Sequence, residues 1–287
     1  MALEKFKPIV WSEKLQKDLD RELVAYENTN HDFEGSASKL GDVVKILGTG
    51  HVTLRKWEDG KMHVLKDPEE LETNSVLMPV KKYVDFNFGV DDLDKAQAEY
   101  GGKLMSDAMS DAKTQIACVQ DSFILGMVQD KNIAIADYST TGVSISESDS
   151  NYILDAIDNA YLKLLENDVT RSTGVTMIVP PTFTMRLKRA YVDLDTNNSE
   201  MLKNGRVGRY GGITIKESNN VSFTGTGSNR VFNIPIMTNK ALAFVKPMIH
   251  MESYRTEKGF TDAVKGYALY DGKVIRPQEI INLKVKM

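Results

Sequence analysis

Residues 83–127 read YVDFNFGVDDLDKAQAEYGGKLMSDAMSDAKTQIACVQDSFILGM, and no other stretch says more about the architecture. The first eight residues alternate apolar and polar side chains, which predicts a strand with one buried face. Asp91 or Asp92 then caps a helical pattern of roughly 40 residues, far beyond the ~11–12 of an average helix. The two sides of the strand are Val84, Phe86, Phe88 and Val90 against Asp85 and Asn87.

The long helical pattern carries one apolar line, with spacings of three and four residues that keep its members on one face. Gly101 and Gly102 interrupt this line, and each costs about 1 kcal/mol relative to alanine inside a helix. Two interpretations stay open: a bend in one helix, or a break between two. The line consists of Leu93, Ala96, Tyr100, Leu104, Ala108, Ala112, Ile116, Val119, Phe123 and Met127.

A predicted hairpin precedes this strand and helix in the sequence. Residues 42–47 form a strand, residues 51–57 and 61–65 form the arms, and Asp59-Gly60 supplies the turn, because both turn positions need a positive φ. Another strand follows at 76–80. The hairpin has no obvious hydrophobic face with which to close a core of its own. A long hairpin beside a long helix therefore indicates a subunit built to touch neighbours, rather than an enzyme.

The N-terminal residues predict an arm that docks by one edge. Residues 1–11 are extended, Ser12 is an N-cap, and a narrow apolar stripe follows at helical spacing among charged residues. The pattern ends near residues 28–30. The stripe consists of Leu15, Leu19, Leu23 and Tyr26.

Beyond the long helix, strands and helices mix in both halves of the chain, which places it in the α+β class. A Ser/Thr-rich segment at 137–150 is a candidate domain boundary. Helices are predicted at 151–169 and 182–192. Strands are predicted at 175–179, 213–217, 230–236, 241–246, 248–254, 264–270 and 280–286.

Composition excludes several classes of protein. The 287 residues carry 36 basic and 40 acidic side chains without a basic stripe, which argues against sequence-specific nucleic-acid recognition. No apolar run approaches the ~18–20 residues that span a bilayer, so no membrane association is expected. The single cysteine, Cys118, excludes an intramolecular disulfide.

No catalytic, cofactor or metal site is predicted. Residues 193–197 open like a calcium loop, but Asn198 stands where glycine is needed and Asn204 where glutamate is needed. The glycines Gly205, Gly208, Gly211 and Gly212 do not have the spacing of a phosphate-binding loop, so tight turns at a subunit contact are favoured. His31, His51, His63 and His250 have no metal-ligand spacing.

The order of these segments resembles the major capsid proteins of tailed bacteriophages. KFKPIVWSEKLQKDLDRELVAYENTN (5–30) precedes DFEGSASKLGDVVKILGTGHVTLRKW (32–57), then KKYVDFNFGVDDLDKAQAEYGG (81–102) and LKNGRVGRYGGITIKESNN (202–220). The family motifs match at Trp11-Ser12-Leu15, Asp32-Phe33-Glu34-Gly35, Gly41-Asp42-Val44-Ile46, and Leu202, Gly205, Val207, Gly208, Gly212, Ile213, Ile215, Ser218 and Asn219.

The resemblance implies a Hong Kong 97-like fold. Its parts would be an N-terminal arm (1–30), an extended E-loop (31–80), a peripheral domain with a long spine helix (81–140, completed by about 247–287) and an axial domain (141–246). Such subunits form the hexamers and pentamers of an icosahedral shell around double-stranded DNA. The expected subunit contacts are Leu15, Leu19, Leu23, Trp57, Asp59, Gly60, Gly205, Gly208 and Gly212.

The resemblance also implies partners and a location. Because Trp11 already begins the arm, a separate scaffolding protein is expected, together with a portal protein and packaged DNA that touches the lumen non-specifically. The protein would be found in the virion, and in the host cytoplasm during assembly. The alternatives are an encapsulin-type nanocompartment shell and, more remotely, a soluble α/β enzyme or binding protein with a concave pocket.

Overall fold

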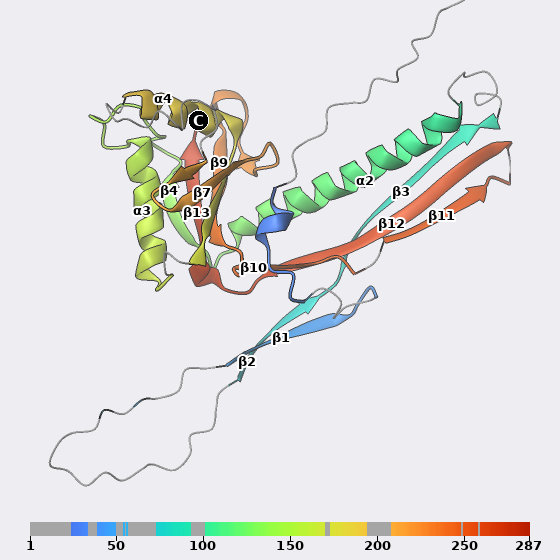
Figure 1. Cartoon of the computed structure of the whole chain (residues 1–287), viewed down its shortest axis with the longest axis horizontal. Coiled ribbons are helices and arrows are strands. Elements are labelled where there is room, and N and C mark those ends of the chain that lie inside the picture. The colour runs from blue at the N-terminus through green and yellow to red at the C-terminus, as the bar shows by residue number, and fades with distance from the viewer. Residues whose placement is uncertain are drawn as a thin grey trace, which may run out of the picture.

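The computed structural model describes residues 24–33, 39–49, 54, 56, 73–92, 101–169, 173–193, 208–247, 249–257 and 259–287. Figure 1 shows an elongated molecule in which a long sheet and one long helix extend from a compact unit of strands and helices. A two-stranded hairpin projects from the junction between these two parts.

The long sheet is built around β12 (Thr261–Val274), which is 14 residues long. One edge of β12 pairs with β3 (Lys82–Asp91), and the other pairs with β11 (Ile249–Arg255) and β10 (Leu242–Val245), all antiparallel. The predicted alternation in β3 is confirmed, because Val84, Phe86, Phe88 and Val90 are buried or partly buried between exposed polar residues.

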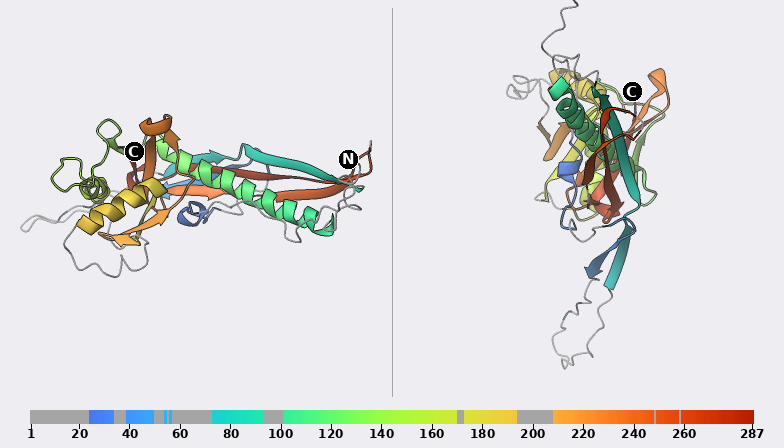
Figure 2. Two further views of the ribbon diagram at one scale, coloured as in Figure 1. Left: turned by 90° about the horizontal axis from the view of Figure 1, so that it is seen from above. Right: turned by 90° about the vertical axis from the view of Figure 1, so that its right-hand side faces the viewer.

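Helix α2 (Gly101–Gly126) runs along one face of this sheet (Figures 1 and 2) and leads into the 3₁₀ turn η3 (Met127–Gln129). The glycine pair stands at the start of α2. Residues 93–100 lie outside the described residues, so the expected length of about 40 residues and the choice between a bend and a break stay untested.

The buried side of α2 differs from the predicted apolar line. Val119 belongs to that line, yet 41% of its surface is exposed, so this part of the prediction is wrong. The C-terminal half of α2 enters the junction between the two sheets, where contacts on several sides bury a wider arc of the helix. The buried residues there are Ile116, Gln120, Asp121, Ile124 and Leu125, followed by Val128 of η3.

The compact unit contains a seven-stranded mixed sheet. In this sheet β13 pairs in parallel with β4, and β5 pairs in parallel with β7. The other neighbouring strands along the main path are antiparallel. The strands in spatial order are β4 (Ala134–Tyr138), β13 (Ile280–Lys286), β9 (Val231–Thr238), β5 (Val175–Val179), β7 (Ile213–Glu217) and β6 (Arg209–Tyr210), with β8 (Phe223–Thr224) on β9.

Two helices, α3 (Ile153–Glu166) and α4 (Pro181–Asp193), accompany this sheet, with the 3₁₀ turns η5 (Gly227–Asn229) and η6 (Pro277–Glu279). Pro181 begins α4, where its missing N–H costs nothing, and Pro180, directly after β5, has no N–H with which to extend the strand pairing. The largest buried cluster lies in this unit and reaches the end of α2 through Ile124 and Leu125.

The seven-stranded sheet contains strands from two parts of the expected division of the chain. β4 and β13 are hydrogen-bonded into the same sheet as β5 and β9, although that division assigns them to the peripheral domain. The Ser/Thr-rich segment between β4 and α3 packs on the compact unit through Val143 and Tyr152, which are both buried. The division into four parts stays a prediction.

The base of the predicted hairpin is present as β1 (Val43–Thr49) paired antiparallel with β2 (Thr73–Pro79). The predicted arms at 51–57 and 61–65 and their turn lie outside the described residues, apart from residues 54 and 56, so the expectation that the hairpin lacks a hydrophobic face stays untested for them. The base does have such a face. Alternate side chains, including Ile46 and Met78, bury one face against β10 and β12 because both strands carry apolar residues at every second position. This small cluster consists of Val44, Ile46, Met78, Val80, Ala243, Val245 and Leu269.

Among the helices that the structure describes, none is long and apolar enough to cross a membrane.

Candidate interaction surfaces

The outward face of the hairpin base is apolar and exposed. Val43 is 54% exposed, Leu47 68% and Leu77 51%, although large apolar side chains are normally buried. Lys45 lies opposite Leu77 in the antiparallel register, so the face carries one cation among its apolar side chains. The opposite face of the same two strands is buried in the subunit, which holds this outward face in place. We call Val43, Leu47 and Leu77 the hairpin patch.

The face of the long sheet that points away from α2 carries no helix; β1 and β2 pack on it near Leu269, and much of the rest is exposed. The Lys82 ammonium lies 3.8 Å from the ring centre of Phe123 in α2, and Tyr270, which pairs with Lys82, also packs on that ring. Because side chains alternate along a strand, Tyr83 and Leu269 point to the opposite side. In the right-hand view of Figure 2, α2 lies on one side of this sheet only.

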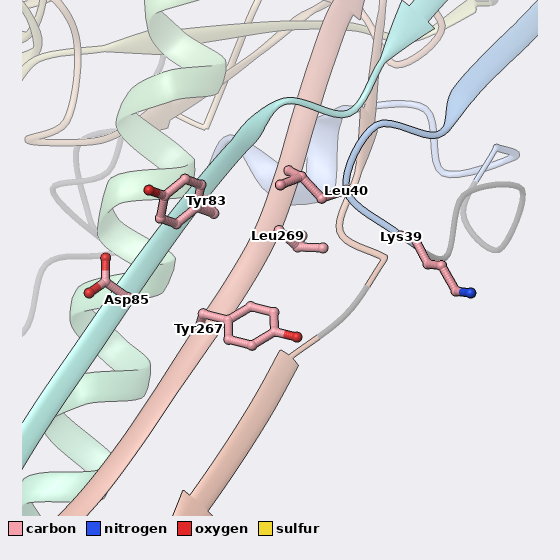
Figure 3. A pocket seen from close by; sticks show the side chains of 6 residues that line it. All are labelled: Lys39, Leu40, Tyr83, Asp85, Tyr267 and Leu269. Carbon is pink, nitrogen blue, oxygen red and sulfur yellow. The ribbon is translucent and has the colours of Figure 1, made fainter.

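An open groove of about 610 Å³ lies where this face meets the loop before β1. Figure 3 shows the groove, with Tyr83 and Asp85 on β3, Tyr267 and Leu269 on β12, and Lys39 and Leu40 on the loop. The loop is held by the Lys39 backbone N–H, which donates to the Asp42 carboxylate at 2.8 Å. The groove combines an apolar floor with one charge of each sign, and this suits a protein surface better than a small ligand.

Farther along the same face, the side chains are polar and aromatic. The Tyr254 hydroxyl donates to Asn87 at 3.0 Å, and Lys265 forms an ion pair with Glu252 at 3.3 Å. This ion pair is about half exposed, so it stabilises the subunit by at most about 1 kcal/mol. A partly exposed tyrosine whose hydroxyl is hydrogen-bonded, such as Tyr254, is typical of surfaces that bind other proteins.

The far end of the long sheet presents an aromatic tip. Phe260, in the turn between β11 and β12, is 76% exposed. Its carbonyl accepts the Asp92 N–H at 2.9 Å, and the Asp92 carboxylate pairs with Arg255. The tip is therefore tied to the end of β3 and holds the Phe260 ring outward.

The arm leaves the described structure at residues 24–30, which we call the arm root. This segment contains the 3₁₀ turn η2 (Tyr26–Asn28). The Ala25 N–H donates to the Asp121 carboxylate of α2 at 2.7 Å, and the Asn30 N–H donates to the Leu242 carbonyl of β10 at 2.8 Å. The root thus contacts both the long helix and the long sheet.

Two of the nine predicted contact residues lie among the described residues. Gly212 and Gly211 form the two-residue turn between β6 and β7, with φ of +99° and +54°, as a tight hairpin of this type requires. Gly208 lies just before β6 and is exposed. The prediction of tight turns is confirmed here, and a subunit contact at these glycines stays a prediction. Outside the described residues lie Leu15, Leu19, Leu23, Trp57, Asp59, Gly60 and Gly205.

Sequence reasoning missed the hairpin patch, although a signal for it is present. In residues 43–47 both sets of alternating positions are rich in apolar residues, with Val44 and Ile46 in one set and Val43 and Leu47 in the other. A strand that is apolar on both sides is typical of burial on both faces. Since the subunit covers only one face, the other face is available for contact with another protein.

Among the described residues, two titratable groups have clearly shifted pKa values. The Ser139 hydroxyl and N–H bond the Asp137 carboxylate and, with Lys284 nearby, lower its pKa. Burial raises the pKa of Tyr270, and the charge of Asp271 adds to this. Neither shift lies in a cluster that resembles a catalytic centre, and the described residues contain no group of His, Cys, Asp and Glu side chains that could hold a metal ion.

No protein-family model and no curated protein matches the sequence. Solved structures match along almost the whole chain. A structure described as Mycobacterium phage Che8 aligns with a TM-score of 0.75 at 24% identity, covering 98% of each chain. The capsid structure of the cyanophage P-SCSP1u gives 0.76 at 14% identity, covering 99% of this chain and 94% of the other. The capsid of Ralstonia phage GP4 gives 0.70 at 12%, covering 98% and 95%.

The agreement spans the long sheet, the spine helix and the compact unit together, and it confirms the fold class expected from the sequence. The chain has the Hong Kong 97-like fold of tailed-phage capsid structures.

Proposed function

We propose that this chain is a structural major capsid protein of a tailed phage or prophage, which self-assembles into the hexamers and pentamers of an icosahedral shell around double-stranded DNA. One observation carries the proposal: the fold agrees with phage capsid structures over nearly the full length of both chains. The agreement includes the elongated sheet and helix, and not merely a common compact domain.

The exposed surfaces support an assembly role on physical grounds. The hairpin patch, the groove and the Phe260 tip are displayed by strands and turns that are themselves well anchored. Each square ångström of apolar surface removed from water contributes about 25 cal/mol, so a neighbour that covers these side chains would stabilise the assembly. A monomeric enzyme would leave this surface exposed without any use for it.

We extend the proposal to the parts and partners of the assembly. The arm (1–30), the E-loop (31–80), the peripheral domain (81–140 with about 247–287) and the axial domain (141–246) would each contact a neighbouring subunit. A separate scaffolding protein and a portal protein would guide assembly, and DNA would touch the lumen without sequence preference. With net charge −4, the chain would not hold packaged DNA by strong general attraction. The protein would reside in the virion after assembly in the host cytoplasm.

Negative-stain microscopy of the purified protein, with size-exclusion chromatography alongside, tests the proposal. Closed shells, tubes or capsomer rings are the expected result, and nucleic acid inside closed particles would support the phage assignment. Particles filled with a packed enzyme would instead support a nanocompartment. A persistent monomer, even when the scaffolding protein is co-expressed, would contradict both assignments.

A further inference from the structure

The carboxylate of Asp121 joins three segments that are far apart in sequence. Its side chain projects from α2 and is 1% exposed. One oxygen accepts the Ala25 N–H of the arm root at 2.7 Å, and the other accepts the Asn220 side-chain amide at 3.0 Å. Both of these donors are neutral groups, 96 and 99 residues away along the chain.

The arm root satisfies much of its own hydrogen bonding. The Asn28 and Thr29 N–H groups donate to the carbonyls of Ala25 and Tyr26, and the Asn28 side chain donates to the Val24 carbonyl at 2.6 Å. A single isolated turn is marginal in water, so these bonds persist only while the root is held against the subunit. The arm root is attached at one end through Ala25 to Asp121 and at the other end through Asn30 to β10.

We propose that Asp121 is a latch: it holds the N-terminal end of the arm root and so sets the direction of the N-terminal arm. It does so independently of the hairpin that follows Asn30. The two backbone attachments are separate, so the bond to Asp121 can open while the bond between Asn30 and β10 stays closed. The consequence for assembly rests on the proposed function, because only an assembling subunit needs a defined arm direction. The latch itself is a property of the single subunit.

A carboxylate suits this role because it only accepts hydrogen bonds. Ala25 and Val24 sit in the apolar cluster that also contains Ile124 and Leu125. If the arm root leaves, one oxygen of Asp121 loses its donor within that cluster, and a buried charged acceptor without a partner is strongly disfavoured. The closed position is therefore favoured by a directed bond as well as by apolar burial. Asn220 keeps the carboxylate oriented through its other oxygen.

Residue-resolved amide exchange on the unassembled subunit tests the latch. In Asp121→Ala, the Asn28 and Thr29 amides should exchange roughly 10- to 100-fold faster, as expected for loss of a hydrogen bond to a charged group. The Asn30 amide, which bonds to Leu242, should exchange as in the wild type. Glu27→Gln is the matched control: it removes the charge that pairs with Lys216 on the exposed side of the same turn and should leave all three amides unchanged.

Asp121→Asn provides a second, milder variant. An asparagine oxygen can still accept the Ala25 N–H, and the Asn220 amide can turn to present its oxygen, so exchange should rise only about threefold to tenfold. If circular dichroism shows that Asp121→Ala does not fold, the exchange measurement is made on Asp121→Asn instead. Unchanged exchange at Asn28 and Thr29 would overturn the latch. An equal rise at Asn30 would overturn the independence of the two attachments.

The assembly consequence is measured separately. Wild-type protein and Glu27→Gln should give the same particles, whereas folded Asp121→Ala should give aberrant or open ones. Normal particles from Asp121→Ala would overturn the claim that the latch directs the arm. If the wild type forms no particles even with the scaffolding protein co-expressed, the proposed function fails while the exchange result still decides the latch.

Discussion

The ring of Phe86 in β3 covers Gly266, its antiparallel partner in β12. A Cβ atom built on Gly266 would come within 2.6 Å of the Phe86 ring and 2.8 Å of the His250 carbonyl oxygen. An aromatic ring thus occupies the space that a side chain would fill, on the face of the sheet that carries α2. The neighbouring Phe88 ring stacks on Phe86 at 5.9 Å and limits any shift.

Gly266→Ala should destabilise the unassembled subunit by about 1–3 kcal/mol, because an added methyl group in a packed core forces the ring or the backbone to move. Urea unfolding measures this. Gly208→Ala is the control, since a Cβ there meets no atom within 4 Å. Equal stability of the two variants would show that Phe86 does not pack on Gly266 as described.

The hairpin patch should matter for assembly and not for folding. Leu47→Ser and Leu77→Ser each replace a side chain that is more than half exposed, so the free energy of unfolding should change by less than about 0.5 kcal/mol. Particle formation should fall sharply, because the replaced side chains would have been buried against a neighbour. Sedimentation of assembled material, beside urea unfolding of free subunits, measures both effects.

A variant on the other side of the same strand is the control for the hairpin patch. Ile46 is buried within the subunit, so Ile46→Ser should lower the free energy of unfolding by about 2–5 kcal/mol. Normal assembly by Leu47→Ser and Leu77→Ser would mean that the patch faces solvent in the shell as well.

The predicted arm stripe gives a test outside the described residues. Replacing Leu19 and Leu23 with serine should leave the subunit folded but impair assembly, if the stripe docks between subunits. Circular dichroism and negative-stain microscopy measure the two outcomes. A subunit that unfolds would mean that the stripe belongs to its own core.

Stability should fall at high pH partly through Tyr270. Burial raises the pKa of this phenol, so the folded state holds its proton more tightly than the unfolded state does. Its contribution is complete below the unfolded pKa of about 10 and is lost as the pH rises through the folded value. Tyr270→Phe should make this decline shallower, and urea unfolding at several pH values measures it. Parallel declines for the wild type and Tyr270→Phe would refute this origin.

Much of the secondary structure was predictable because the patterns are strong and local. The alternation in β3 and the periodicity of α3 correspond directly to buried faces. β4 was missed: it is a five-residue edge strand whose Ile135 is exposed, so it carries little pattern of its own. The resemblance of the ordered motifs, rather than any single pattern, indicated the fold.

The candidate surfaces were harder to predict because they depend on tertiary contacts. Whether Val43 or Val44 faces the core follows from the packing of β1 on β10 and β12, which no local pattern specifies. Asp121 looked like an ordinary polar residue of a long helix. Its burial arises because the arm root and the loop around Asn220 close over it.

Cryo-electron microscopy of assembled particles would show directly what covers the hairpin patch. We expect a closed icosahedral shell in which Val43, Leu47 and Leu77 of each subunit lie against a neighbouring subunit. Particles in which these three side chains face solvent, or a protein that stays monomeric even with its scaffolding partner, would contradict this expectation.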